Sequence, residues 1–558
     1  MRNEILKELK KLTGLAEKVL EQKLETPPNP ELGDYAFPCF ILASKFKKSP
    51  EDIARDLSKE FKLENDISIH VNGPYLNFFI NKRKFSEDII KQILKEKDKF
   101  GKNKVGSKSV VMIEFPSPNT NKPLHLGHLR NMSIGESISR IHEFVSQKVI
   151  RGNLNNDRGV HICKSMVAYE NWGKNKNPNK KSDHFVGDFY VLYNQKLKTN
   201  PKLEKQTQEC LQKWEAGDKQ TITIWKKMNK WALDGFKETY KKFKIKHDKE
   251  YFESKIYKGG KEVIEEGLKK GIFEKGKDGE IKINLEKENL GEKVVLRSDG
   301  TSVYITQDLY LAKLKYQEFK LTNSIYVVGN EQDYHFKVLS KILEKLDLPF
   351  KVQHLSYGMV NLPSGKMKSR EGKVVDADDI IEETNKLAKK EILDREPKLN
   401  KSEVGKRAEA ISLGAIKYQL LKIDSAKNIL FNPEESIAFE GNTGPYIQYT
   451  YARSSSILRK IKKKIKDQKP KSIHESEIEL IKEMNNFQET VESAYKHLNP
   501  ALLANYSFQL AQKFNDFYQN CPVIGDENEA FRLKIVEAYK IVIKSALNLL
   551  GIDVLEEM

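Results

Sequence analysis

The sequence has few cysteines and lacks any long apolar run. Its four cysteines, Cys39, Cys163, Cys210 and Cys521, lie far apart and form no C-x-x-C pair. This spacing argues against a zinc cage and a disulfide framework, so we expect no protein-bound metal. No stretch approaches the roughly 20 apolar residues that span a bilayer, and the amino terminus, MRNEILKELKKL, is too charged for the core of a signal peptide. These absences predict a cytoplasmic protein with no membrane partner.

The length and the charge of the chain further restrict the class of protein. A chain of 558 residues is long enough for about three or four domains. With 39% hydrophobic and 32% charged residues, its composition is that of a globular protein. Its 97 basic residues exceed its 79 acidic residues, and the net charge of +18 suits a polyanionic partner. A lysine-rich proteome explains the same excess about equally well, so charge alone does not identify the partner.

The most specific stretch runs from Val110 to Arg130 and reads VVMIEFPSPNTNKPLHLGHLR. Its beginning is β-branched or otherwise apolar except for Glu114, which predicts a buried strand. From Leu129 onward the apolar residues recur at helical spacing. These residues are Ile134, Ile138, Ile141 and Val145. The stretch therefore predicts a strand, a turn rich in proline and asparagine, and then a helix.

Two histidines lie at the predicted entry to this helix. The unpaired backbone N–H groups and the dipole of a helix amino terminus favour a phosphate near His125 and His128. Gly127 between them leaves space for a flat ring against the backbone. Lys122 adds a positive charge just upstream. A histidine in isolation is more often structural than a ligand, so the motif has to be judged with its flanking residues.

Those flanking residues resemble a known signature. The segment SPNTNKPLHLGHLRN (117–131) is similar to the HIGH signature of class I aminoacyl-tRNA synthetases, in the form that arginyl-tRNA synthetases use. Nucleotidyltransferases share a His-x-Gly-His step, so the flanking SPN and KP carry the narrower resemblance. The resemblance implies that His125 and His128 donate hydrogen bonds to the phosphoryl oxygens of ATP.

A second segment, SGKMKSREGK (364–373), resembles the mobile KMSKS loop of the same enzymes. Its glycine, serine and lysine content suits a cationic clasp for phosphate. Lys366 and the following methionine match the signature, but Ser369 stands where the second lysine belongs. Arginyl-tRNA synthetases often show this gap, and Lys122 occupies the upstream place of the lysine thought to compensate. The resemblance therefore implies that Lys122 binds the pyrophosphate group, with Lys366 and Lys368 assisting. The residues expected to contact ATP are His125, Gly127, His128, Met359, Lys366, Met367 and Lys368.

Acidic residues predict the amino-acid specificity, because a planar guanidinium calls for carboxylates that accept paired hydrogen bonds. Glu114 is a charge on an apolar strand, and with no partner in its motif it predicts a cationic ligand. Tyr304 and Asp308 share one face if helical, and both match arginine-binding positions of the family. Without the resemblance, Asp308 would be interpreted as an acid on a helix surface. Asn119 and Gln332 match positions that hold the α-ammonium and carboxylate. The residues expected to bind arginine are Glu114, Asn119, His125, Tyr304, Asp308 and Gln332.

Three parts are expected along the chain. Residues 1–105 predict an α/β domain, residues 106–385 a catalytic domain with a Rossmann-like parallel sheet, and residues 386–558 an all-α bundle. About 165–255 is interpreted as an insertion in the catalytic domain. The strand-like runs of that domain are 109–115, 148–154, 324–329 and 354–360.

Polar residues follow three of these strand-like runs. They are Asn119 and His125, then Asn156 and Asp157, then Gln332 and His335. Ligands of parallel sheets bind at the carboxyl ends of the strands, so we expect these residues to converge on one site.

The first and last parts resemble the tRNA-binding domains of arginyl-tRNA synthetases. The segment ISIHVNGPYLNFFIN (67–81) predicts a hairpin around an Asn-Gly turn. By the resemblance, Asn72, Tyr75 and Asn77 match positions that meet the D-loop of tRNA, although an ordinary hairpin explains each residue about as well. Glu253 matches a position near the terminal adenosine of the tRNA.

Near the carboxyl terminus, ESIAFEGNTGPYIQYTYAR (435–453) resembles the loop and helix of the anticodon-binding bundle. Exposed aromatic side chains there could stack on unpaired bases. Tyr446 and Tyr449 lie three residues apart on one helical face, so we expect one of them to be core.

The resemblance as a whole implies an arginine–tRNA ligase. Its substrates would be L-arginine, ATP bound with Mg²⁺, and tRNA(Arg), its catalytic residues Lys122, His125, His128 and Lys366, and bound tRNA would be needed for the first step. We expect a monomer. The alternatives are another class I synthetase, such as one for cysteine, and a non-catalytic RNA-binding protein. The absent zinc site opposes the cysteine enzyme, and the retained histidines and acids oppose the non-catalytic protein.

Overall fold

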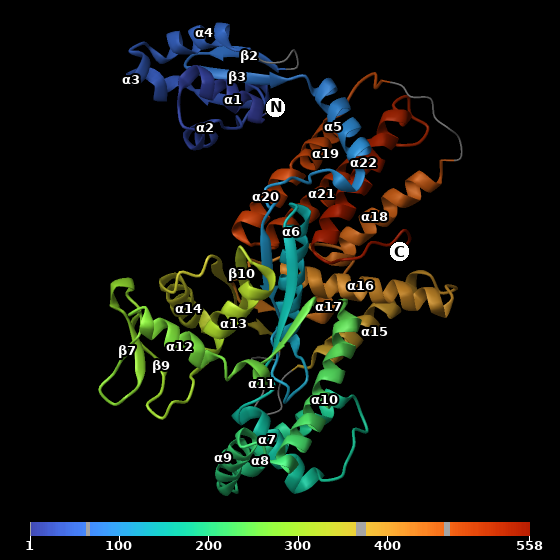
Figure 1. Cartoon of the computed structure of the whole chain (residues 1–558). Coiled ribbons are helices and arrows are strands. Elements are labelled where there is room, and N and C mark those ends of the chain that lie inside the picture. Colours follow the sequence, from blue (N-terminus) through green and yellow to red (C-terminus); the bar gives the residue numbers. More distant parts are fainter. Residues whose placement is uncertain (1, 63–66, 364–374, 462–468) are drawn as a thin grey trace. The chain divides into compact units, whose positions relative to one another are not determined.

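The structure, a computed structural model, describes the chain except for residues 1, 63–66, 364–374 and 462–468 (Figure 1). The chain forms two compact units, each assembled from segments that are distant in the sequence. The first comprises Met1–Lys97, Lys463–Asn485 and Asp516–Ala538, and the second comprises Asp98–Lys462, Asn486–Asn515 and Tyr539–Met558. Within the described residues, no helix is both long enough and apolar enough to span a membrane. The three-part division expected from the sequence stays a prediction.

The first unit contains a three-stranded antiparallel sheet. Its strand order is β1 (Tyr35–Pro38), β3 (Tyr75–Ile80) and β2 (Ile67–Asn72). The predicted hairpin is confirmed, but its turn lies at Gly73 and Pro74, one residue later than the expected Asn-Gly turn. Gly73 has a φ of +52°, a conformation that glycine adopts without strain.

Helices cover this sheet and complete its core. They include α1 (Arg2–Thr13), α2 (Glu17–Lys23) and α4 (Pro50–Glu60). Ser49 caps α4 by accepting a hydrogen bond from the backbone N–H of Asp52, and Pro50 occupies the first helical turn, where its missing donor has no cost. Ile53 and Leu57 of α4 join Phe37, Leu76 and Phe78 of the sheet in one buried core.

The second unit is built on a five-stranded sheet in which every pairing is parallel. In spatial order the strands are β11 (Lys351–Tyr357), β10 (Asn323–Gly329), β4 (Val110–Glu114), β5 (Lys148–Asn155) and β6 (Lys249–Phe252). The predicted parallel sheet is therefore confirmed, with the apolar strand β4 at its centre. Two details differ from the prediction. The run expected at 354–360 begins earlier and ends at Tyr357, and β6 was missed because it has only four residues.

Helices connect the strands and hold the inserted segments. Helix α6 (Leu126–Phe144) follows β4, and α13 (Tyr304–Phe319) and α14 (Asp333–Lys345) flank β10 in the sequence. Helix α7 (Val160–Ala168) leads into the expected helical insertion, which contains α8 (Ser182–Leu197), α9 (Lys202–Glu215) and α10 (Lys219–Phe243). The sequence did not predict a small antiparallel sheet, formed by β7 (Glu274–Lys275), β8 (Ile281–Leu285) and β9 (Gly291–Leu296).

The described residues from 386 onward are mostly helical, as predicted, and the helices of this part begin at Ala377. The long helices described there are α15 (Ala377–Arg395), α16 (Lys401–Leu421), α18 (Gly444–Arg459), α19 (Glu475–Asn485), α20 (Phe487–His497), α21 (Ala501–Asn520) and α22 (Glu529–Leu549). One exception is the short strand β13 (Ile429–Leu430). It pairs in parallel with β12 (Val360–Asn361), which follows β11 in the sequence.

Candidate active site

The two histidines lie at the amino terminus of α6, as the sequence predicted. His125 is the residue before the first helical turn, and its backbone N–H donates to Nδ1 of His128 at 3.0 Å. The two rings pack with their centroids 3.8 Å apart. A Cβ atom on Gly127 would lie 3.0 Å from Cε1 of His125, so only glycine lets this ring lie against the helix start without displacement.

Burial keeps both histidines neutral. The pKa of His125 is lowered to about 3, first by burial and then by the charge of Lys122. The pKa of His128 is lowered well below its ordinary value by burial and by His125 and Lys122. Because Nδ1 of His128 accepts a hydrogen bond, its single proton is on Nε2, which can therefore donate. Among the described residues, Nδ1 of His125 is buried and has no hydrogen-bond partner.

The ends of β4 and β5 bring predicted residues together. Asn119 and Asn156 form a parallel bridge, and the N–H of Thr120 donates to the carbonyl of Asn156 at 3.2 Å. The carboxylate of Asp157 accepts hydrogen bonds from the backbone and the hydroxyl of Ser254, at 2.8 and 2.7 Å. Asp157 thereby fixes the start of α11 (Glu253–Ile256) rather than facing a ligand.

Residues of α13 meet the end of β10. Tyr304 begins α13 and is 77% exposed, and Asp308 lies one turn later, which confirms the expected helix. Oδ2 of Asp308 lies 2.6 Å from Nε2 of His335, the residue that the sequence placed after β10 without a role. Gln332 ends the short helix η6 (Asn330–Gln332) and is exposed. Asp308 therefore presents a half-buried carboxylate beside the strand ends.

Glu114 already has a cationic partner within the chain, and this partner lies far outside the sequence motif in which none was found. Its Oε2 accepts a hydrogen bond from Nζ of Lys315 at 2.6 Å, and the two side chains are 5% and 0% exposed. Burial tends to lower the pKa of Lys315, but the Glu114 carboxylate reverses this and leaves the pKa raised. Lys315 also lies 4.2 Å from the ring centroid of Tyr326 on β10. The assignment of Glu114 to arginine stays a prediction. One oxygen of its carboxylate is already hydrogen-bonded to Lys315.

The predicted phosphate clasp lies outside the described residues, and so do its members Lys366, Met367 and Lys368. The residues that flank it are bonded to the histidine segment. On one side, the buried Arg130 of α6 donates to the carbonyl of Gly358 at 2.6 Å, next to Met359, which is 48% exposed. Arg130 also bonds the carbonyl of Lys427 at 2.8 Å. The sequence analysis gave Arg130 no role, because its acceptors are all distant backbone carbonyls.

The other flank pairs directly with the residues around His125. The N–H of Leu126 donates to the carbonyl of Val375, and the N–H of Ala377 donates to the carbonyl of Leu124, both at 3.0 Å. His125 and Asp376 thus form an antiparallel bridge. Both flanks of residues 364–374 therefore lie at the amino-terminal part of α6, as a shared phosphate site requires.

Glu253 is buried at the start of α11, near the strand ends. Burial raises its pKa to about 7, with further contributions from Asp157 and Asp308, while Arg158 works in the opposite direction. Nη1 of Arg158 lies 3.7 Å from Oε1 of Glu253. A carboxyl with this pKa changes charge near neutral pH, which is unusual for glutamate.

The residues expected to meet tRNA differ in exposure. Asn72 is exposed, and Tyr75 is half-buried with its ring edge-on to Phe40, which is 53% exposed. Asn77 is only 5% exposed in the central strand β3, so the expectation that it offers its amide to a base is not supported. A hydrogen bond to RNA would need movement of the sheet around it.

Tyr446 and Tyr449 both lie on α18, and both are half-buried. The expectation that one of them is core is wrong. The hydroxyl of Tyr446 accepts a hydrogen bond from Asn515 at 2.7 Å. The guanidinium of Arg453 lies 4.9 Å from the ring centroid of Tyr449. Each tyrosine keeps part of its surface open to a partner.

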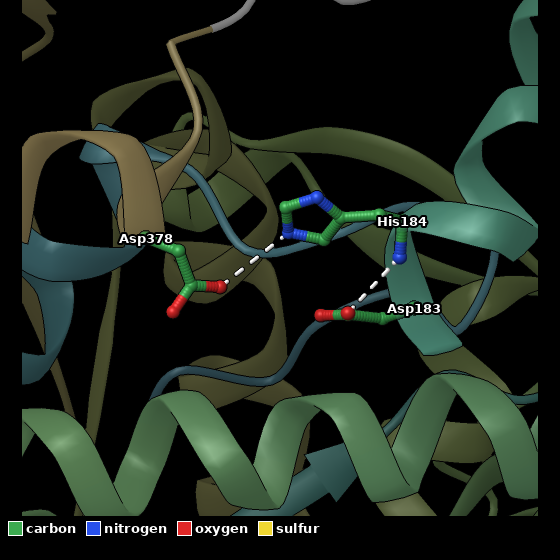
Figure 2. Close-up of side chains that lie close together, drawn as sticks. All are labelled: Asp183, His184 and Asp378. Atoms are coloured by element: carbon green, nitrogen blue, oxygen red, sulfur yellow. Dashed lines mark hydrogen bonds and ion pairs between the residues drawn. The ribbon is translucent and has the colours of Figure 1, made fainter. Parts of the chain in front are cut away.

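One group of described side chains has donor atoms close enough to surround a metal ion. Asp183, His184 and Asp378 each offer an atom within 4.8 Å of the others (Figure 2). The ammonium of Lys181 is already hydrogen-bonded to both carboxylates, at 2.9 Å from Asp183 and 2.6 Å from Asp378. A lysine in that position repels a metal ion, so the group is a network of ion pairs and does not fit a metal site.

Comparisons with known families cover nearly the whole chain. Residues 1–80 match the arginyl tRNA synthetase N terminal domain, residues 89–433 match the catalytic domain of tRNA synthetases class I (R), and residues 447–558 match the DALR anticodon binding domain. Together with the parallel sheet and the His-x-Gly-His step at a helix amino terminus, these matches define a class I aminoacyl-tRNA synthetase.

Relatives identify the family within this class. The arginine–tRNA ligase of Treponema denticola is 46% identical over 575 residues, covering 98% of each chain. The arginine–tRNA ligase of Borrelia turicatae is 43% identical and covers 100% of this chain and 99% of its own. The solved arginyl-tRNA synthetase of Thermus thermophilus is 25% identical, with a TM-score of 0.84, and the match covers 100% of this chain and 99% of that one. The chain belongs to the arginyl-tRNA synthetase family, whose members are ligases that form aminoacyl-tRNA.

Proposed function

We propose that this chain activates L-arginine with ATP and then transfers the arginine to the 3′-terminal adenosine of tRNA(Arg). The observation that carries the proposal is full-length similarity to arginine–tRNA ligases, at 46% identity for the Treponema denticola enzyme. The strand–turn–helix with its two half-buried histidines supports it, because adenylation depends on aligning reactants and stabilising phosphoryl charge.

In the first step, a carboxylate oxygen of arginine attacks the α-phosphorus of ATP, and the bond to pyrophosphate breaks. The neutral histidines would donate to the phosphoryl oxygens without competing for a proton, since the pKa of His125 is lowered to about 3. Lys122 and Lys366 would balance the charge of the departing pyrophosphate, assisted by Lys368. The Mg²⁺ that neutralises the phosphates would enter with ATP as part of the substrate.

The guanidinium of arginine would be held by Asp308, with Tyr304 alongside and Glu114 supplying its second carboxylate. Asp308 supports this assignment because it is half-buried and bonded to His335, so its position is fixed before substrate binds. Asn119 and Gln332 would hold the α-ammonium and carboxylate. Both are exposed at strand ends of the same sheet.

The tRNA would be bound by residues of both units. Asn72 and Tyr75 would meet its elbow, Tyr446 and Tyr449 the anticodon, and Glu253 the terminal adenosine. Transfer would join the arginyl carboxyl to the 2′-hydroxyl of that adenosine and release AMP. We also propose that bound tRNA is required for the first step, and that the protein is a cytoplasmic monomer.

The deciding experiment is aminoacylation of bulk tRNA with each of the twenty amino acids in turn. Arginine alone should be attached. Attachment of another amino acid would favour a different class I enzyme, and attachment of none would favour a non-catalytic RNA-binding protein. Arginine-dependent exchange between ATP and pyrophosphate, measured with and without tRNA, tests the tRNA requirement, which efficient exchange without tRNA would contradict.

A further inference from the structure

A group of ion pairs joins the helical insertion to the segment beside His125. We call this group the charge cluster. It consists of Lys181, Asp183, His184, Lys242, Asp376 and Asp378. Within this set three acids face three cations, so their formal charges cancel. The cluster spans the start of α8, the end of α10 and the start of α15, which are far apart in the sequence.

Lys181 is the centre of the cluster. Its ammonium donates to Asp183, to Asp378 and to the hydroxyl of Thr239, at 2.9, 2.6 and 2.6 Å. The other oxygen of Asp378 accepts from Lys242 at 3.1 Å. The Lys181 side chain is 12% exposed, and those of Asp183 and Asp378 are 0% and 7% exposed. The ion pairs of Lys181 are therefore largely shielded from water, whereas Lys242 is 42% exposed.

His184 supplies the third cation. Its Nε2 lies 3.3 Å from Asp376 and 3.4 Å from Asp378, and Figure 2 shows its ring directed toward Asp378. The nearby carboxylates of Asp376 and Asp378 raise the pKa of His184 to about 10, despite partial burial. The pKa of Asp378 is lowered by His184, Lys181 and Lys242, although burial acts in the opposite direction. At neutral pH the His184 side chain is thus positively charged.

Asp376 connects the cluster to the phosphate site. Its carboxylate faces His184 and caps α15, accepting from the N–H of Asp378 at 2.8 Å. Its backbone forms the bridge with His125. The hydrogen bonds on each side of this bridge join Val375 to Leu126 and Ala377 to Leu124. A shift of Asp376 would therefore move the backbone on which His125 stands.

Stability alone does not explain such a cluster. Buried ion pairs seldom stabilise a fold more than apolar residues of the same volume, because the cost of desolvating the charges offsets their attraction. Their directional bonds do fix geometry, and a displacement of about 1 Å at a reacting group can lower a rate roughly 100-fold. We propose that the charge cluster is a positioning device that holds residues 375–377 against Leu124–Leu126 and so sets the placement of His125 toward ATP. This inference rests on the proposed function, because it assigns His125 to ATP.

The test compares Lys181→Met with Lys180→Met in the full-length protein. Lys180 is the adjacent residue and forms an exposed ion pair with Asp188 at 2.6 Å, so its variant controls for loss of a lysine at this place in the chain. Arginine-dependent ATP–pyrophosphate exchange is measured in the presence of tRNA. For Lys181→Met we expect kcat to fall roughly 10- to 100-fold with a higher KM for ATP. The KM for arginine should rise by a smaller factor than the KM for ATP, because the proposed guanidinium ligands lie on β4 and α13 and only His125 is also expected to contact arginine.

The split between ATP and arginine separates positioning from general damage. If Lys181→Met raises the KM for ATP and the KM for arginine by the same factor, the inference is wrong. It is also wrong if Lys181→Met has the same kinetic constants as Lys180→Met. Should Lys181→Met be insoluble, His184→Gln keeps both lysines and carries the same test with the same expected split. Restoration by Lys181→Arg would add support, since arginine keeps the charge. A wild-type protein with no arginine-dependent exchange would instead overturn the proposed function.

Discussion

Lys315 donates a hydrogen bond to Glu114 over 2.6 Å, and water reaches almost none of either side chain. The pair joins α13 to the end of β4, where the site begins. Asp308 lies two helical turns before Lys315 on the same helix, so the pair also limits where Asp308 can stand. Glu114 and Lys315 therefore connect the sheet to the helix proposed to hold the guanidinium of arginine.

Replacing Lys315 by methionine should lower the free energy of unfolding and raise the KM for arginine. The change leaves the Glu114 carboxylate buried without its cation, which typically costs about 3–5 kcal/mol of unfolding free energy. Lys313→Met is the matched control, because Lys313 lies on the same helix and pairs with Glu266 at a partly exposed position. That control should cost at most about 1 kcal/mol. Denaturant unfolding measures both values.

The double variant Glu114→Gln with Lys315→Met removes both charges and tests the cause of the effect. It should recover part of the stability that Lys315→Met loses, because no lone buried charge remains. Its KM for arginine should stay raised if Glu114 contacts the substrate. A wild-type KM in the double variant would remove Glu114 from the pocket.

Asp308→Asn should raise the KM for arginine strongly. The neutral amide loses a charge-assisted hydrogen bond worth about 1.5–3 kcal/mol, which corresponds to a roughly 10- to 150-fold change in binding. Glu318→Gln is the control on the same helix, since Glu318 lies at the opposite end of α13 from Tyr304 and accepts a hydrogen bond from Tyr251 at 2.8 Å. Steady-state ATP–pyrophosphate exchange gives both constants. An unchanged KM in Asp308→Asn would exclude Asp308 from the pocket.

Local signals predicted the strand, the turn and the helix around the histidines. The apolar run that begins at Val110 is buried as β4, and the helical spacing after Leu129 belongs to α6. Each signal is carried by neighbouring residues, so it can be seen without knowing the fold. The strands β6 to β9 are short, so too few neighbouring residues carry a signal, and the sequence did not predict them.

The partners of buried charges could not be predicted in this way. Lys315 stands in a lysine-containing helix and resembles a solvent-facing residue, yet it meets Glu114 from 201 positions away. Lys181 and Asp378 are likewise 197 positions apart. Periodicity says which face of an element is buried, but only the folded chain says which charges share that burial.

Glu253 should make the transfer step depend on pH near neutrality. Its pKa, raised to about 7 by burial, means that the carboxyl is mostly protonated below pH 7 and ionised above it. If the ionised form accepts a hydrogen bond from the terminal ribose, charging of tRNA should rise with pH through about 7. Glu253→Gln should flatten that rise, while Glu250→Gln, at an exposed position on β6, should keep it. If charging by Glu253→Gln rises with pH at the same midpoint as in the wild type, another group causes the pH dependence.

Acid should destabilise the protein partly through His142, which lies on α6 away from the phosphate site. Burial lowers its pKa to about 4 from the value of 6.5 that applies when it is unfolded, although a hydrogen bond with Gln147 acts in the opposite direction. Between these two values the unfolded chain binds more protons than the folded one, so stability rises with pH across this window. The contribution of His142 is thus complete above about pH 6.5 and falls by up to roughly 3 kcal/mol as the pH approaches 4.

His142→Asn tests this sign directly, because asparagine keeps a side-chain donor toward Gln147, whose oxygen lies 2.5 Å from Nδ1 of His142, but does not titrate. The thermal midpoint of this variant should fall less between pH 7 and pH 4.5 than that of the wild type. His70→Asn, at an exposed position on β2, should follow the wild type. His125, His128 and His247 have pKa values lowered by burial too, so a reduced acid sensitivity is expected rather than none. Equal pH dependence in His142→Asn and the wild type would show that the protonation of His142 is not coupled to unfolding.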